Sequence, residues 1–313
     1  MTESINGHES VEPINLQEAR DKAFQFLETQ QENGHFNAHL SSTPDMLESH
    51  DSPKEIASTL LVFETVLQQH QDSPIFHQSL SYLKSQLDNG RYHFFEDLFL
   101  LPSDTETTSY GLSSLLRAGT IDRKEAEKTA DEIIRTTDES GIIMVYFEPC
   151  DKENQIDHVS ATNVLTLLNM LGRGDEAKET ENFVLDQLQK GAYLEGSRYY
   201  HSPDTFIYFL GRMIEQCPNM KDRFEEPLRK AVRSHVGMTE TPIEIAMRCT
   251  TLARLGENPA ELNKLLRAQG TDGGWNSNSI YHYGGKVGYF GSRAITTAFA
   301  LEAIDKVEAL RKK

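Results

Sequence analysis

Basic residues are scarce in this sequence: 31 lysines and arginines face 48 aspartates and glutamates, which gives a net charge of -17. A surface of that sign does not attract a phosphate backbone, so we expect no nucleic acid partner. Long hydrophobic runs are also missing. Because no stretch approaches the roughly 20 apolar residues that cross a bilayer, we expect no integral membrane segment.

Cysteine is rare as well. Cys150, Cys217 and Cys249 are odd in number, far apart and not at metal-ligand spacing. This pattern argues against a disulfide framework and predicts no metal site built on cysteine. It fits a reducing compartment, and we expect a cytoplasmic protein.

The first 14 residues, MTESINGHESVEPI, lack the basic start and apolar centre of a signal peptide. They are polar, and we expect them to be disordered. Residues 15–313 have an ordinary globular composition and are expected to form a single domain.

A glycine turn followed by an apolar or aromatic residue returns six times, at intervals of 36 to 56 residues. The central glycines are Gly34, Gly90, Gly141, Gly196, Gly237 and Gly273. Each interval is long enough for two helices. A capping Ser, Thr or Asp, often followed by Pro, marks a helix start after each turn. The six starts are Ser52-Pro53, Ser103-Asp104, Asp157, Ser202-Pro203, Thr241-Pro242 and Ser292.

The helices that follow these starts are apolar around much of their circumference, and charged amphipathic helices alternate with them. The pattern predicts an all-α fold, an α/α toroid in which about six helical hairpins form a double ring. An open helical solenoid is the alternative, but no polar capping repeat is present. Only residues 142–147 have strand character, and we expect them in a loop.

Two acidic residues stand at one predicted helix start, in LPSDTETTSYGL (101–112). Asp104 and Glu106 could simply cap the helix and complement its dipole. Alternatively, a carboxyl group in an apolar pocket stays protonated, and a second carboxylate nearby raises its pKa further. Such a pair is suited to protonating an alkene or an epoxide.

Two motifs carry a resemblance to a known family. QGTDGGWNS (269–277) resembles the Q-x-x-x-G-x-W repeat of the squalene–hopene cyclase and prenyltransferase α-toroid superfamily, and DTETTS (104–109) resembles the acid motif of class II terpene cyclase β domains. The second motif is nearest the D-x-D-T-T form of drimane-type sesquiterpene synthases. The resemblance implies that Glu106 donates the proton and that Asp104 orients it. Because this sequence has Glu where the family has Asp, Asp104 remains an alternative donor.

The last repeat is rich in aromatic residues, and the faces of such rings attract cations. Its candidates for a substrate pocket are Trp275, Tyr281, Tyr283, Tyr289 and Phe290. For Trp275 we favour a structural role within the turn motif. His158 follows Asp157 at the third apolar helix start, where it could hydrogen-bond the acid or merely cap the helix.

Lys286 and Arg293 flank the glycine-rich run GGKVGYFGSR before the last apolar helix. They are the candidates for holding an anionic head group such as a diphosphate. The resemblance and the acid pair together predict a protonation-initiated cyclisation of a linear prenyl substrate. That chemistry needs no cofactor, although Mg²⁺ would help to hold a diphosphate.

Two other functions remain open. A six-hairpin glycosidase has the same double ring and uses two carboxylates, and a non-catalytic toroid could bind a lipid or a protein. A single ring also lacks the second domain that usually completes a class II pocket. We therefore expect either a small cavity or a homodimer or partner chain that closes it.

Overall fold

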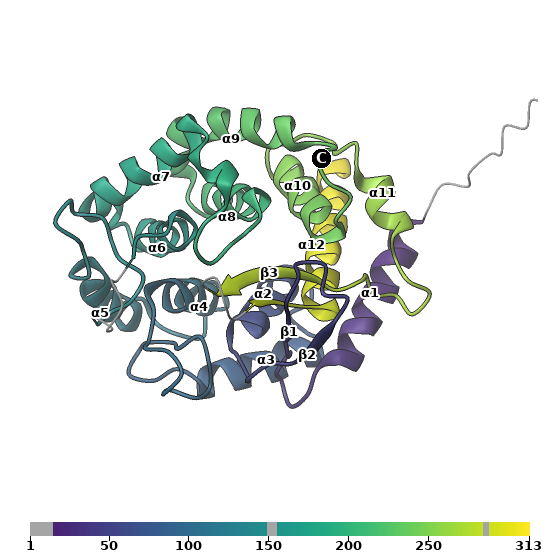
Figure 1. Ribbon diagram of the computed structural model, residues 1–313, viewed down its shortest axis with the longest axis horizontal. Helices are drawn as coiled ribbons and strands as arrows, with labels where there is room; N and C mark the ends of the chain where they lie inside the picture. The colour runs from purple at the N-terminus through teal and green to yellow at the C-terminus, as the bar shows by residue number, and fades with distance from the viewer. Residues whose placement is uncertain (1–14, 149–154, 284–287) are drawn as a thin grey trace, which may run out of the picture.

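The computed structural model describes residues 15–148, 155–283 and 288–313. Twelve α-helices within these residues form two concentric layers (Figure 1). The inner helices are α2 (Ala57–Leu67), α4 (Thr105–Arg117), α6 (His158–Met170), α8 (Pro203–Gln216), α10 (Pro242–Arg254) and α12 (Arg293–Arg311). The outer helices are α1 (Leu16–Gln30), α3 (Pro74–Ser85), α5 (Arg123–Ile134), α7 (Lys178–Lys190), α9 (Lys221–His235) and α11 (Leu262–Arg267). Three short 3-10 turns complete the helical part, at Gly174–Ala177, Ala192–Glu195 and Pro218–Met220.

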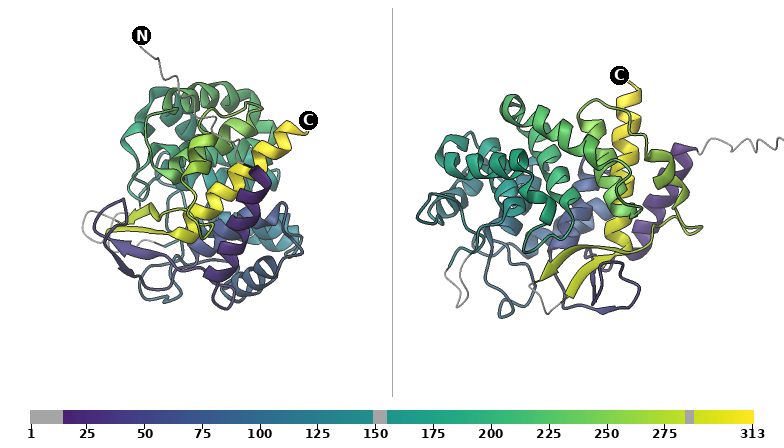
Figure 2. Two further views of the ribbon diagram at one scale, coloured as in Figure 1. Left: turned by 90° about the vertical axis from the view of Figure 1, so that its right-hand side faces the viewer. Right: turned by 45° about the horizontal axis from the view of Figure 1, so that its top comes forward.

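The ring is closed. Each inner helix packs against the next, and α12 packs against both α10 and α2. The outer helix α1 also contacts α12, so the first and last helices meet at a seam (Figure 2). The predicted toroid is therefore observed and the open solenoid is wrong.

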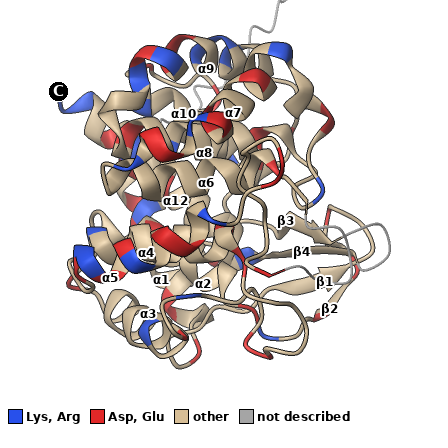
Figure 3. Ribbon diagram, turned by 90° about the vertical axis from the view of Figure 1, so that its left-hand side faces the viewer, with Lys and Arg blue, Asp and Glu red and all other residues tan. Residues whose placement is uncertain are grey.

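Burial separates the two layers as the sequence pattern predicts. Every residue of α2 is buried. The outer helix α9 instead buries one stripe that includes Phe224, Leu228 and Val232, and it exposes charges of both signs (Figure 3). Among the described helices, none is long and apolar enough to cross a membrane.

The recurrent turn glycines adopt positive φ angles, and Gly273 shows why. A Cβ atom on Gly273 would lie 2.3 Å from the backbone oxygen of Lys22 in α1. The same turn sends the Gln269 side-chain amide to the carbonyls of Ala19 and Gly273, at 2.8 Å each. The indole nitrogen of Trp275 donates to the Leu265 carbonyl at 2.7 Å. This turn therefore ties the last repeat to the first.

Five of the six predicted inner-helix starts agree with the structure to within two residues. The first is corrected: α2 begins at Ala57 rather than near Pro53. Ile56 donates its backbone N–H to the Phe94 carbonyl at 2.8 Å, and Glu55 bridges to Phe95, so the preceding chain is held extended. Glu55 then takes the capping role, because its carboxylate accepts the Ser58 N–H at 2.7 Å.

The all-α prediction is incomplete, because a small antiparallel sheet joins the first and last repeats. Its strands are β1 (His39–Ser41), β2 (Ser49–Asp51), β3 (Asn278–Tyr283) and β4 (Gly288–Ser292), in the order β2-β1-β4-β3. The segment before α12, for which we expected no strand, forms β3 and β4. Its alternating aromatic residues favour a strand that is buried on one face. Residues 142–147 form a loop with isolated bridges, as predicted.

Buried charges lie at the C-terminal ends of the inner helices. Glu64 of α2 accepts hydrogen bonds from Arg212, Ser114 and Gln216 and pairs with Arg117. Arg212 is fully buried, and its guanidinium lies 4.2 Å from the centre of the Tyr110 ring.

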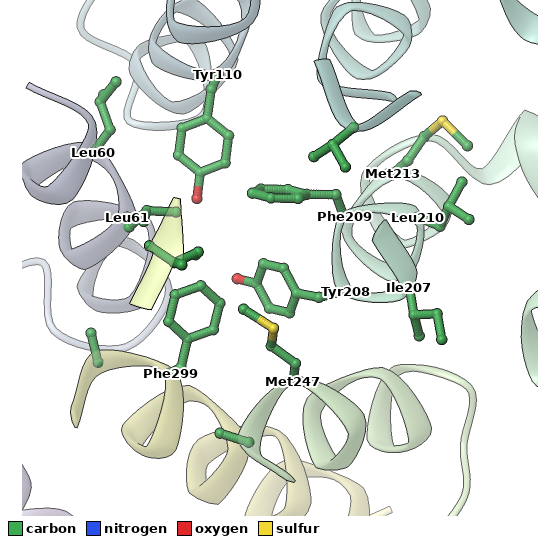
Figure 4. Packing of buried hydrophobic residues seen from close by; sticks show 14 of the residues in the cluster. Leu60, Leu61, Tyr110, Ile207, Tyr208, Phe209, Leu210, Met213, Met247 and Phe299 are labelled. Atoms are coloured by element: carbon green, nitrogen blue, oxygen red, sulfur yellow. The ribbon is translucent and has the colours of Figure 1, made fainter. Parts of the chain in front are cut away.

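Aromatic and aliphatic side chains fill the centre of the ring (Figure 4). Tyr110, Phe209, Tyr208 and Phe299 point toward one another there. The lumen of the ring is thus packed at this end.

Candidate active site

A cavity opens at the other end of the ring, where the inner helices begin. It offers about 750 Å³ of space when counted to its open mouth. Ten of the lining residues are aromatic: Phe94, Phe95, Tyr110, Tyr146, Tyr199, Tyr200, Phe209, Tyr281, Tyr283 and Phe290.

Glu106 lies in the wall of this cavity, in the first turn of α4. One carboxylate oxygen accepts hydrogen bonds from the Tyr200 hydroxyl at 2.5 Å and the Asn163 amide at 3.0 Å. The other accepts from the Ser160 hydroxyl at 2.6 Å. Three neighbours therefore fix the orientation of the Glu106 carboxyl group.

Asp104 lies in the same wall and caps α4. Its Oδ1 accepts the Thr107 N–H at 2.6 Å, and its buried Oδ2 has no hydrogen-bond partner among the described residues. Capping and lining the cavity are therefore not exclusive alternatives for Asp104, because the same carboxyl group does both.

Burial raises the pKa of both acids, which is the direction that acid catalysis requires. It raises the pKa of Glu106 to about 8, and the charges of Asp157 and Asp104 add to the rise, while hydrogen bonds from Ser160 and Tyr200 oppose it. Burial raises the pKa of Asp104 to about 6, against the hydrogen bonds of its cap. At neutral pH, Glu106 is therefore the carboxyl group that retains a proton.

Three of the predicted aromatic residues reach this cavity, namely Tyr281, Tyr283 and Phe290. Strands β3 and β4 place Tyr281 opposite Phe290, and the ring of Phe94 packs edge-on against both. Tyr289 is not among the lining residues and stacks on His282 instead.

The other predicted residues lie elsewhere. Trp275 is fully buried in the turn described above, in line with the structural role that we favoured. Arg293 makes a bidentate pair with Asp272 at 2.8 Å and lies over Phe26. The ring of His158 packs edge-on against Phe206 rather than on Glu106. Lys286 lies outside the described residues.

Sequence reasoning missed the three donors to Glu106. Ser160 and Asn163 belong to α6, and Tyr200 precedes α8, so they lie 54, 57 and 94 residues away from Glu106. Their signal was present but weak. SATN (160–163) places polar side chains at the start of a helix that is otherwise apolar, next to the capping Asp157.

The polar groups of the described cavity wall carry no positive charge. Acids, tyrosines, Thr107, Asn163 and His282 line it, and neither lysine nor arginine does among the described residues. Burial also lowers the pKa of His282. The described residues likewise contain no group of three or more His, Cys, Asp or Glu side chains that could hold a metal ion.

The structure thus combines a closed double ring of helices with an oriented carboxyl group in the wall of an aromatic cavity. Residues 22–170 match the family described as the sesquiterpene cyclase astC-like C-terminal domain. The chain is also 31% identical over 206 residues to drimenol cyclase drtB of Aspergillus calidoustus. That match covers 65% of this chain and 38% of the relative, so the matched region is well under half of the relative's length. Both matches show similarity to cyclase-type proteins over part of this chain.

Solved structures agree on the fold. A protein from Actinoplanes superposes with a TM-score of 0.71 at 14% identity and covers 94% of this chain and 100% of its own. A variant of type II terpene cyclase MstE from Scytonema, in complex with geranylgeranyl dihydroxybenzoate, gives 0.66 at 12% identity and covers 94% and 97%. At such identities the likeness concerns the fold alone.

Proposed function

We propose that this protein is an enzyme that cyclises a linear prenyl substrate after protonating it, with Glu106 as the proton donor. The observation that carries the proposal is the carboxyl group of Glu106, which is held by three donors in the wall of an aromatic cavity. The similarity to a drimenol cyclase and to the astC-like domain supports the reaction class.

The site meets two opposing requirements of such an acid. Burial and the neighbouring carboxylates keep the proton on Glu106 at neutral pH. After transfer, the new carboxylate is stabilised by the hydroxyls of Tyr200 and Ser160 and by the Asn163 amide, because hydrogen bonds to a charged acceptor are strong. In this scheme the substrate alkene takes the proton, and a carbocation forms among the rings.

The aromatic walls suit that cation. Tyr281, Phe94 and Phe290 form an edge-to-face cluster on one side, and Tyr200 and Phe209 do so on another. Ring faces attract a cation by about 0.5–2 kcal/mol each. Deprotonation of the final cation, or capture of water, would end the reaction.

A prenyl diphosphate would have to place its head group outside the described cavity wall, which bears no lysine or arginine. Proton transfer from Glu106 to an alkene does not itself use a metal ion.

The test is Glu106→Gln, with Asp104→Asn and Glu139→Gln as companions. Gln keeps the shape and can still accept hydrogen bonds, but it has no acidic proton. We expect a loss of at least about 10²–10⁴-fold in turnover of C10, C15 and C20 prenyl substrates, with folding unchanged. Glu139 is an exposed acid in a turn, so its variant should retain full activity.

Asp104→Asn preserves the cap, and we expect a smaller loss from it. If Asp104→Asn were inactive and Glu106→Gln active, the donor would be Asp104. Full activity in both variants would refute protonation at this site and leave a non-catalytic lipid- or partner-binding toroid as the better account. Cleavage of glycosides, with no conversion of prenyl compounds, would favour the glycosidase alternative.

A further inference from the structure

The large exposed hydrophobic residues of the described chain all lie at one end of the ring. They are Leu47, Leu98, Phe99, Leu100, Leu194, Val236 and Met238. Every one belongs to a segment that leaves an outer helix and leads into an inner helix: α1 to α2, α3 to α4, α7 to α8, or α9 to α10. These segments gather at the end of the ring where the cavity opens.

The most prominent of these groups is Leu98-Phe99-Leu100, which we call the apolar tip. The side chain of Phe99 is 99% exposed. The tip is nevertheless ordered by a local turn, since Asp97 accepts the Phe99 N–H on its carboxylate at 3.0 Å and the Leu100 N–H on its carbonyl at 3.1 Å. A chain that folds a turn around three outward apolar residues presents them to something other than water.

The tip also borders the cavity. Phe94 and Phe95 precede it, Leu101 follows it, and all three line the cavity. A backbone bridge between His93 and Ser103 closes the base of the loop. Whatever covers the tip therefore lies beside the cavity.

We propose that this end of the ring docks on the surface of an electrically neutral lipid bilayer, with the apolar tip inserted among the lipids. The choice of lipid rests on the proposed function, since a prenyl chain dissolves in a bilayer and can pass from it into the cavity. The apolar groups are small and stand on four separate segments. A fluid surface receives each one independently, whereas a protein partner needs a contiguous patch of about 800 Å².

Charge selects the kind of lipid. The stretches around the exposed groups, residues 43–51, 92–104, 191–197 and 236–241, contain acidic residues and neither lysine nor arginine. The basic residues Lys54, Arg91 and Arg198 lie just outside these stretches, within the same inter-helix segments. Peripheral proteins that recognise anionic lipids use clusters of basic residues. The docking face should therefore prefer phosphatidylcholine and lose affinity as phosphatidylserine is added.

Fluorescence gives a direct test, because the chain has one tryptophan, Trp275, and it is fully buried. In Phe99→Trp, a second tryptophan reports on the tip. We expect phosphatidylcholine vesicles with brominated acyl chains to quench this emission at least about twofold and shift it to the blue, as for an indole at the acyl boundary. Wild-type protein, and Asp72→Trp on the exposed α2–α3 loop at the opposite end, should show neither change.

A paired variant tests the energetics. Leu98→Ser/Phe99→Ser should sediment with phosphatidylcholine vesicles at least about tenfold more weakly than the wild type, because it removes most of the inserted apolar surface. It should turn over a detergent-dispersed prenyl substrate at the wild-type rate. Tip emission in Phe99→Trp that no vesicle quenches would overturn the proposal, as would a double variant that binds vesicles normally.

Failure of docking and failure of the proposed function are distinguishable. Vesicle binding does not need turnover, so Glu106→Gln should dock as the wild type does. Quenching in a protein with no cyclase activity leaves docking intact and refutes only the chemistry. If the double variant instead dissociates a dimer or loses a protein partner, the tip is a protein interface and the lipid proposal is wrong.

Discussion

Removal of the Tyr200 hydroxyl should change the pKa of the proposed acid, Glu106, while its carboxyl group stays in place. Tyr200 is buried, and its hydroxyl donates to Glu106 at 2.5 Å. Phe at this position keeps the ring that packs against Phe209 and Tyr281. Since this hydrogen bond lowers the pKa of Glu106, its loss raises that pKa above about 8.

The size of the effect follows from the strength of the bond. A hydrogen bond to a charged acceptor contributes about 1.5–3 kcal/mol, and one pKa unit corresponds to about 1.4 kcal/mol. The pKa of Glu106 should therefore rise by roughly one to two units. The same interaction is lost from the transition state as the carboxylate forms, so turnover should fall about 10- to 100-fold.

The assay is the turnover number as a function of pH. The proposed acid must be protonated, so activity is lost as pH rises through the pKa of Glu106. In Tyr200→Phe this alkaline limb should move to higher pH while the plateau falls. Tyr199→Phe is the matched control: Tyr199 also lines the cavity, but its hydroxyl donates to Tyr146 and not to Glu106. Its alkaline limb should stay in place.

The infrared carbonyl stretch of the protonated carboxyl group, assigned by its disappearance in Glu106→Gln, follows the same titration without substrate. An alkaline limb that moves to lower pH in Tyr200→Phe would refute the reasoning. So would a fall in rate with no shift in either titration, because the hydroxyl would then act only through packing.

Two further outcomes follow from the same electrostatics. Asp157→Asn keeps a side chain that caps helices well but removes a charge that raises the pKa of Glu106. The alkaline limb of the variant's activity should therefore move to lower pH. A shift to higher pH would contradict this cause. The folded-state pKa of Glu106 lies above its ordinary value of 4.5, so stability that is fully present below that value is lost as pH rises through about 8. By calorimetry, we expect the melting temperature of Glu106→Gln to exceed that of the wild type by about 2 °C or more at pH 9. At pH 4 the two melting temperatures should be equal. Equal melting temperatures at both pH values would show that the carboxylate is well solvated.

The helical part of the fold could be predicted because its signals are local. Asp104, Asp157, Ser202 and Ser292 all accept a backbone N–H from the first turn of the helix that they precede. Such caps depend only on neighbouring residues. The start of α2 was missed because a long-range pairing of Ile56 with Phe94 holds the chain extended where the Ser-Pro signal stands.

The small sheet escaped prediction for a related reason. Strands β1 and β2 have three residues each, and β1 finds its second partner in β4, about 250 residues away: Leu40 lies opposite Phe290. Three residues are too few for an alternating pattern to stand out. The pairing exists only because the closed ring brings the two segments together.

In the candidate site, too, only the residues with local signals could be predicted. The acid pair lies within one helix turn and was found from its spacing and resemblance. Tyr200 and Asn163 come to Glu106 from other repeats. The polar SATN start around Asn163 is only a weak signal, and no pattern around Tyr200 indicates that contact. Arg293 was a reasonable candidate for an anion, but Asp272 had already neutralised it within the turn. Pairings of this kind become visible only in three dimensions.

The seam between α1 and α12 has a consequence for how the protein is made. A ribosome releases α2 well before its neighbour α12, because nearly the whole ring lies between them in the sequence. Until then, one flank of α2 and the turn-binding surface of α1 lack their partners. Closure thus depends on contacts of very high sequence separation, which form slowly. Until α12 emerges, a nascent chain would expose an incomplete crescent of apolar helices, and it would be a client for chaperones during that time.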